Sequence, residues 1–263
     1  MRASGARVVL TGATGGIGRA LAMAFHAAGA ELVLTGRREA ALGELAARTG
    51  GRAVVADLAL AADVERLCRE AEAADILVAN AALPASGRLD GFDAAGIEQA
   101  LAVNLHAPIR LARAAVPAMV GRGRGHLLLV SSLAGVAATP ESSLYAATKF
   151  GLRGFGLALR QDLHGTGVGV SVLLPGFVRD AGMFAESGAT LPRGVGTRSP
   201  EQVAAAALGA VEHDRAEVVV APLALTAGAY LAGFAPGPVG RLQRILGGDR
   251  VARAIAAGQS ARH

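Results

Sequence analysis

Short runs of valine, isoleucine and leucine alternate along most of the chain with longer stretches rich in alanine and leucine. This alternation predicts βαβ units, because two parallel strands need a long, usually helical, crossover between them. Such units build an α/β fold, a doubly wound parallel sheet of about seven strands with helices on both faces. The expected strands are 7–11, 31–35, 52–56, 75–79, 126–131, 168–174 and 217–220, and the expected helices are 16–28, 40–48, 61–73, 93–120, 143–164 and 200–212.

Two segments lack this alternation. Residues 177–197 have little periodicity and are expected to form a mobile lid or loop. Residues 222–263 are expected to form an apolar, helical C-terminal tail of the substrate pocket or of a subunit interface. No repeat or linker interrupts the chain, so residues 1–263 are expected to form one domain. No charge occurs between Glu217 and Arg241, but proline and glycine crowd that stretch. No transmembrane segment is therefore expected, and loose membrane association stays open.

Composition narrows the function classes. The net charge is +5, yet tryptophan is absent, aromatic residues make up 3% of the chain and no basic run interleaves with them. Nucleic-acid binding is therefore not expected. A single cysteine, Cys68, excludes an internal disulfide and is expected to be a small buried residue. No metal site is predicted. Residues 1–6 lack the apolar core of a signal peptide, so a cytoplasmic location is expected.

The first expected strand leads into a glycine-rich turn, Thr11-Gly12-Ala13-Thr14-Gly15-Gly16-Ile17-Gly18. Glycines let the backbone approach a pyrophosphate, and the following helix directs free N–H groups and its positive end at the phosphates. The strand before and the helix after favour this interpretation over an ordinary strand-to-helix turn. The sequence therefore predicts a Rossmann-like dinucleotide site, with Gly12, Thr14, Gly15, Gly16, Ile17 and Gly18 in the binding turn.

The residues that end the second expected strand indicate the choice of cofactor. An NAD site usually carries an acid there to hold the ribose 2′-hydroxyl, but this chain has Gly36 followed by Arg37 and Arg38. An arginine can clamp a 2′-phosphate with two hydrogen bonds. The sequence favours NADP(H) bound by Arg37 and Arg38. The alternative is a pair of solvated arginines and acceptance of NAD(H) as well.

A tyrosine and a lysine provide the strongest catalytic signal. Lys149 is the only lysine among 26 basic residues, and Tyr145 lies four residues before it, so both belong to one helix face. Ser132 ends the fifth expected strand, 13 residues before Tyr145. The alternative, a surface tyrosine–lysine pair, does not account for this serine or for the glycine-rich turn.

Together these motifs resemble the short-chain dehydrogenase/reductase family over residues 7–220. Its TGxxxGxG motif is present at Thr11, Gly12, Gly16 and Gly18, whereas its NNAG motif is altered to Ala79-Asn80-Ala81-Ala82. The resemblance implies that the catalytic residues are Asn104, Ser132, Tyr145 and Lys149. It also implies that further cofactor contacts come from Asp57, Leu58, Asn80, Ala81, Ala82, Tyr145, Lys149, Pro175, Gly176 and Val178.

The resemblance further implies roles for these side chains. Tyr145 would exchange the proton in an interconversion of carbonyl and alcohol. Lys149, with oxidised nicotinamide nearby, would lower the pKa of Tyr145, and it would also bind ribose hydroxyls. Ser132 would hold the substrate oxygen, and Asn104 would hold a water that links Lys149 to solvent through its helix backbone. Asp180 stands where the family often has threonine, and it either accepts from the nicotinamide amide or turns away.

The substrate is expected to be an apolar ketone or secondary alcohol, such as a lipid, steroid or polyketide-like compound, because the lid and tail are rich in apolar residues. Alternatives are a non-catalytic NADP(H)-binding sensor or scaffold protein, a membrane-associated structural protein, and an epimerase or dehydratase on the same fold. The resemblance implies a homodimer or homotetramer.

Overall fold

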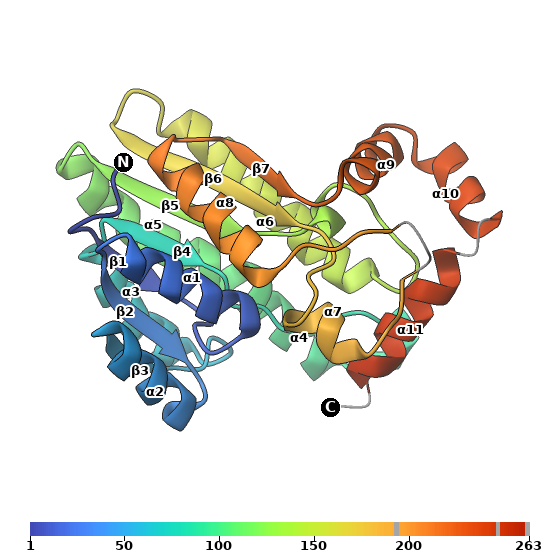
Figure 1. Cartoon of the computed structure of the whole chain (residues 1–263), viewed down its shortest axis with the longest axis horizontal. Coiled ribbons are helices and arrows are strands. Elements are labelled where there is room, and N and C mark those ends of the chain that lie inside the picture. Colours follow the sequence, from blue (N-terminus) through green and yellow to red (C-terminus); the bar gives the residue numbers. More distant parts are fainter. Residues whose placement is uncertain (192–194, 246–247, 261–263) are drawn as a thin grey trace.

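A sheet of seven parallel strands forms the centre of the computed structural model, in the order β3-β2-β1-β4-β5-β6-β7 (Figure 1). The structure describes residues 1–191, 195–245 and 248–260. The predicted doubly wound α/β fold is confirmed. The strands are β1 (Arg7–Leu10), β2 (Glu31–Gly36), β3 (Arg52–Val55), β4 (Ile76–Ala79), β5 (Gly125–Val130), β6 (Val168–Pro175) and β7 (Glu217–Val220).

Helices cover both faces of this sheet and bury a core on each. One core joins alternate residues of the central strands to α1 (Gly16–Ala27), α2 (Glu39–Thr49) and α8 (Pro200–Glu212). The other core joins the intervening strand residues to α3 (Ala61–Glu72), α5 (Ala107–Gly121) and α6 (Ser143–Asp162). Consecutive strand side chains point to opposite faces. Central strands buried on both faces therefore need the unbroken apolar runs seen in the sequence.

The expected long helix over residues 93–120 is interrupted. It begins as α4 (Ala94–Leu101), passes through a π-helical turn, η2 (Ala102–His106), and continues as α5. The turn contains Asn104, whose side chain is buried. A π turn leaves its backbone groups out of the ordinary hydrogen-bonding register, and such turns occur often at functional sites.

The segments without periodicity contain short helices. The expected loop over 177–197 includes the six-residue helix α7 (Gly182–Ser187), which is too short to produce a periodic pattern, and its residues 192–194 lie outside the described residues. The tail forms α9 (Leu223–Phe234), α10 (Pro236–Ile245) and α11 (Gly248–Ser260), while 246–247 and 261–263 lie outside the described residues. Two single turns, η1 (Leu89–Gly91) and η3 (Leu133–Gly135), complete the fold. Among the described residues, no helix combines the length and apolarity needed to span a bilayer.

Candidate active site

The chain leaves β1 and β4 in opposite directions across the sheet, because strand order reverses between them. Ligands of open α/β sheets bind in the crevice at such a reversal, beyond the carboxyl ends of the strands. Two adjoining cavities lie there. The glycine-turn cavity, of about 680 Å³, is lined by the turn after β1 and by the ends of β2, β3 and β4. The tyrosine cavity, of about 370 Å³, is lined by the ends of β5 and β6 and by α6, α7, α9 and α11.

The glycine-rich turn is packed so closely that no side chain fits at Gly12 or Gly18. Gly12 has a φ of +66°, and a Cβ atom there would lie 2.7 Å from the Cα atom of Ala81. A Cβ atom on Gly18 would collide with the Gly12 carbonyl oxygen. Gly15 caps the start of α1 without a side chain. The first N–H groups of α1 are therefore accessible to a phosphate.

Asn80 ties this turn to the end of β4. Its side-chain nitrogen donates to the carbonyls of Thr11 (3.0 Å) and Gly12 (3.2 Å). In return, the Thr11 hydroxyl oxygen accepts from the backbone N–H groups of Asn80 and Ala81, both at 3.0 Å. The asparagine that survives in the altered NNAG motif thus holds the turn on the sheet.

Two arginines follow β2 at the rim of the glycine-turn cavity. Arg38 donates to the carbonyl of Thr14 at 2.6 Å, so its guanidinium braces the glycine-rich turn. Arg37 is more than half exposed, and its nearest carboxylate oxygen, on Asp57, lies 3.9 Å away. At that distance the pair is weak, which leaves the Arg37 guanidinium available to an anion in the cavity. The cavity size, the bare glycine turn and the two arginines fit an NADP-type dinucleotide.

The reactive groups line one wall of the tyrosine cavity. Tyr145 and Lys149 lie on the same face of α6, and the Lys149 Nζ atom lies 5.6 Å from the centre of the Tyr145 ring. Lys149 is buried and donates to the Val130 carbonyl at 3.1 Å. The Ser132 hydroxyl, at the end of β5, accepts from the N–H of Ala134 at 3.1 Å.

Burial governs the protonation of both side chains. Burial raises the pKa of Tyr145 to about 12, against a smaller lowering by the Ser132 hydroxyl. Burial also lowers the pKa of Lys149 to about 8. Without a cofactor, loss of hydration is the larger influence on the tyrosine. The expectation that Lys149, with oxidised nicotinamide nearby, lowers the pKa of Tyr145 stays a prediction. At neutral pH the tyrosine holds its proton.

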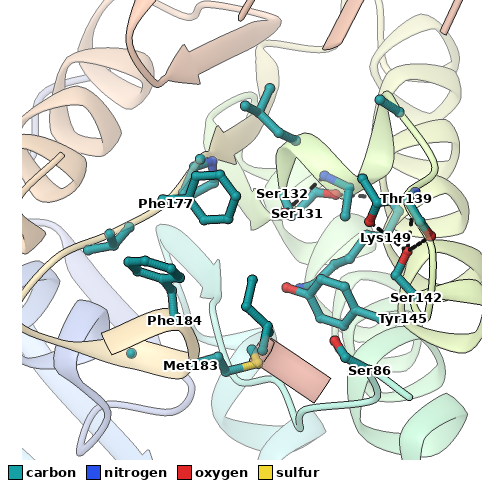
Figure 2. Close-up of a pocket in the computed structure, with 18 of the residues that line it drawn as sticks. Ser86, Ser131, Ser132, Thr139, Ser142, Tyr145, Lys149, Phe177, Met183 and Phe184 are labelled. Atoms are coloured by element: carbon teal, nitrogen blue, oxygen red, sulfur yellow. Dashed lines mark hydrogen bonds between the residues drawn. The ribbon is translucent and has the colours of Figure 1, made fainter. Parts of the chain in front are cut away.

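Most of the remaining lining of the tyrosine cavity is apolar, although Ser86, Thr139, Glu141 and Ser142 also contribute to it. Phe177 and Phe184 meet at 4.9 Å between ring centres, and Figure 2 shows them with Met183 across the cavity from the Tyr145 hydroxyl. Further apolar contacts come from α9 through Leu225 and Ala229 and from α11 through Ala252 and Ile255. A ligand in this cavity would thus place one polar group beside Tyr145 and its apolar body against helices α7, α9 and α11.

Asn104 does not line either cavity, but it is hydrogen-bonded to Leu83, which lines the glycine-turn cavity. Its side-chain oxygen accepts from the N–H of Leu83 at 2.7 Å, and its nitrogen donates to the Leu83 carbonyl at 3.0 Å. Both ends of the amide are therefore used to fix the segment after β4. Asp180 lies outside the cavity lining: its side chain is 74% exposed and pairs with Arg179 at 3.3 Å. Of the two alternatives for Asp180, the structure has the one that turns away.

The structure thus brings most of the sequence-derived candidates together. Those of the glycine-turn cavity are Gly12, Thr14, Gly15, Gly16, Ile17, Gly18, Arg37, Arg38, Asp57, Leu58, Asn80, Ala81 and Ala82. Those of the tyrosine cavity are Ser132, Tyr145, Lys149, Pro175, Gly176 and Val178. Sequence reasoning missed Ser86, Thr139, Glu186, Ser187, Ala252, Ile255 and Gly258, which also line the cavities. They belong to no motif, and only the folded chain brings them to the site.

Fold and site together define an oxidoreductase of the Rossmann-like α/β class. The family model described as short chain dehydrogenase matches residues 6–192, which is more than half of the chain. The chain therefore belongs to the short chain dehydrogenase family, and the resemblance found in the sequence is confirmed.

Known proteins similar to this chain include enzymes of that family. A ketoacyl reductase, HetN, from Nostoc is 32% identical over 82% of this chain and 79% of its own. Dehydrogenase/reductase SDR family member 7B from Bos taurus is 33% identical over 89% of this chain and 79% of its own. Among solved structures, a short-chain dehydrogenase from Sphingobium yanoikuyae in complex with NADPH is 29% identical, covers 89% of this chain and 94% of its own, and superimposes with a TM-score of 0.78.

Proposed function

We propose that this chain is an NADP(H)-dependent oxidoreductase that interconverts a carbonyl and a secondary alcohol on an apolar small molecule, with Tyr145 as the acid and base. The observation that carries the proposal is the tyrosine cavity itself, where Ser132, Tyr145 and Lys149 lie together in a lining that is mostly apolar. The NADPH complex of the Sphingobium relative and the description of HetN as a ketoacyl reductase support it.

The chain's own residues would divide the work as follows. The glycine-rich turn and Asn80 would hold the dinucleotide, with Arg37 and Arg38 at its 2′-phosphate. A bound NADPH supplies the hydride that adds to the carbonyl carbon. Tyr145 would donate its proton to the carbonyl oxygen, and Ser132 would hydrogen-bond that oxygen as it gains charge. Lys149, with a pKa of about 8, would then return a proton to Tyr145. One hydride and one proton convert C=O into CH–OH.

The test follows NADPH absorbance with the purified chain and a series of ketones graded in size and polarity, with NADH in parallel. We expect consumption of NADPH, fastest with apolar ketones. The Tyr145→Phe variant should lose activity by orders of magnitude and still bind NADPH. The other tyrosine of the chain, Tyr230, offers the matched control, because it does not line the tyrosine cavity and its hydroxyl bonds Glu217 instead.

Three outcomes would change the assignment. Tight NADPH binding without turnover of any ketone would favour the sensor or scaffold alternative. Conversion of a substrate without net change in absorbance would favour an epimerase or dehydratase. Unchanged turnover in Tyr145→Phe would remove Tyr145 from the mechanism.

We also propose that the chain forms a homodimer or homotetramer. The exposed side chains of Val120 on α5 and Phe150 on α6 support this proposal, because both helices belong to the family's usual interface. Sedimentation equilibrium of the whole chain tests it, and a single species of monomer mass at all concentrations would contradict it.

A further inference from the structure

Helix α9 carries an apolar outer face that nothing in the described chain covers. Nine large apolar side chains are exposed among the described residues, and four of them lie on this one helix. Phe234 is 90% exposed, Leu223 is 83% exposed and Leu231 is 57% exposed, and Tyr230 is the fourth. Their spacing, at 223, 230, 231 and 234, places them along one stripe of an α-helix. We call these four residues the α9 stripe.

The helix is seated firmly, so the stripe is a fixed surface. Its inner residues Ala229 and Ala232 are buried against Leu133 and Ala137. A Cβ atom on Gly233 would lie 2.7 Å from the Val136 carbonyl oxygen, so this glycine permits close approach. The Tyr230 hydroxyl donates to Glu217 at 2.6 Å and ties the helix to the start of β7. The stripe therefore cannot turn inward to bury itself.

The charges that follow the stripe are positive. No charged residue occurs between Leu223 and Gly240, and residues 223–263 contain five arginines and one acid, Asp249. Among them, Arg241 on α10 and Arg253 on α11 are exposed. Helix α10 packs against α9, and Figure 1 places both at the periphery of the molecule, beyond the end of β7. The apolar face of α9 thus adjoins a helix, α10, that carries the exposed Arg241. An apolar surface next to a positive charge matches an anionic lipid surface, which offers acyl chains and negative headgroups.

We propose that the α9 stripe docks onto the surface of an anionic phospholipid bilayer. The size of the stripe favours a lipid surface over a second copy of the chain. Helix α9 has 12 residues, so it is about 18 Å long. At a width of about 10 Å it offers roughly 200 Å², far below the ~800 Å² per partner of a stable protein interface. A bilayer needs no matching surface of that area. The proposal does not depend on the proposed catalytic function.

Vesicle sedimentation with the whole chain tests this docking. Vesicles that contain phosphatidylglycerol with phosphatidylcholine should carry the chain into the pellet, vesicles of phosphatidylcholine alone should carry less, and added salt should release it. The Leu231→Ser/Phe234→Ser variant should bind the anionic vesicles at least about tenfold more weakly, because two apolar side chains no longer enter the bilayer.

A matched control comes from two equally exposed leucines elsewhere on the molecule. Leu60 is 57% exposed and Leu89 is 58% exposed, and Leu60→Ser/Leu89→Ser should bind vesicles as the unmodified chain does. If the double variant on α9 fails to fold by circular dichroism, Leu223→Ser, near the start of the helix, replaces it with the same expected direction.

Three results would overturn the proposal. One is an unmodified chain that ignores anionic vesicles. Another is equal binding by the α9 variant and the control variant. The third is an α9 variant whose only change is a shift from dimer to monomer in sedimentation equilibrium, which would assign the stripe to a second copy of the chain. None of these results depends on enzymatic turnover, so they leave the proposed function untouched.

Discussion

The ammonium nitrogen of Lys149 lies 5.6 Å from the ring centre of Tyr145 and donates its hydrogen bond to Val130 rather than to the tyrosine. In the proposed mechanism Lys149 would therefore act on Tyr145 by supplying protons across one helix turn, and not through a direct hydrogen bond. Burial holds the pKa of the lysine near 8 and that of the tyrosine near 12. These pKa values suit reduction of a carbonyl. Tyr145 is protonated at neutral pH, and Lys149, an acid of lower pKa, can replace the proton that Tyr145 donates.

We predict that Lys149→Met lowers kcat for ketone reduction about 100-fold or more, the usual contribution of a positioned acid–base group. Lys149→Arg should rescue little, because the larger planar guanidinium does not fit the buried site of Lys149. Steady-state kinetics with the best ketone measures both variants. Full activity in Lys149→Arg would mean that any cation suffices there.

The pH dependence of reduction should follow the lysine. Below a pH of about 8 the Lys149 side chain is charged and can resupply the proton, and above it the charge is lost. We expect kcat/KM for ketone reduction to be flat near neutrality and to fall as pH rises through about 8. A profile that stays flat to pH 10 would exclude Lys149 as the group that titrates.

Arg37 and Arg38 should differ in what they do for the cofactor. Arg37→Ala should raise the Kd for NADPH about tenfold to 100-fold and leave the Kd for NADH unchanged, because only the 2′-phosphate loses a charged hydrogen bond. Arg38→Ala should weaken both cofactors, since Arg38 also braces the Thr14 carbonyl. Fluorescence titration measures both constants. Arg110→Ala, which breaks an exposed ion pair with Glu65, provides the control, and equal losses for NADPH and NADH in Arg37→Ala would contradict the assignment.

Asn104→Ala should destabilise the fold by about 1–3 kcal/mol, because the N–H and carbonyl of Leu83 lose their partners. Urea unfolding measures the change. Asn104→Asp keeps the acceptor for the Leu83 N–H, and a protonated carboxyl can also donate to the Leu83 carbonyl. The loss in unfolding free energy should therefore be smaller for this variant at acidic pH than at neutral pH, and both variants are measured at the two pH values. An unchanged unfolding free energy in Asn104→Ala would indicate that solvent replaces the amide.

His126 should make the fold sensitive to acid. Its ring is buried at the start of β5, with Nε2 at 2.9 Å from the Ser171 hydroxyl, and burial lowers its pKa to about 4. Between pH 6.5 and 4 the unfolded chain therefore binds an extra proton, so this stability is lost as pH falls. The loss approaches roughly 3 kcal/mol, at 1.36 kcal/mol for each unit of pKa shift.

In urea unfolding, the free energy of unfolding of the His126→Gln variant should fall by roughly 3 kcal/mol less than that of the unmodified chain over the same pH range. The reason is that glutamine does not titrate. The carboxyl groups of both chains titrate alike and cancel in the comparison, apart from Asp214, whose carboxylate lies 3.9 Å from the ring and whose pKa His126 helps to lower. Parallel pH curves for the two proteins would mean that the histidine does not carry the acid sensitivity.

Features of the site that depend on local sequence could be predicted, and those that depend on burial or on distant segments could not. The glycine-rich turn and the Tyr145–Lys149 pair follow from spacing along one strand, turn or helix. The π turn at Asn104 could not be predicted, because the composition of residues 102–106 is that of an ordinary helix. The raised pKa of Tyr145 depends on burial in the finished fold, and the contact of Ile255 with the cavity needs a chain reversal that no motif marks.

The two cavities share a wall made of Ile17, Asn80, Ala82, Gly182 and Met183. A dinucleotide resting on one side of α7 would therefore complete the surface that a substrate meets on the other side. A shared wall of this kind couples the binding of dinucleotide and substrate. If the bound dinucleotide changes the affinity for substrate by some factor, bound substrate changes the affinity for the dinucleotide by the same factor. Because Met183 of α7 lines both cavities, a substitution there would change the affinity of the chain for both ligands.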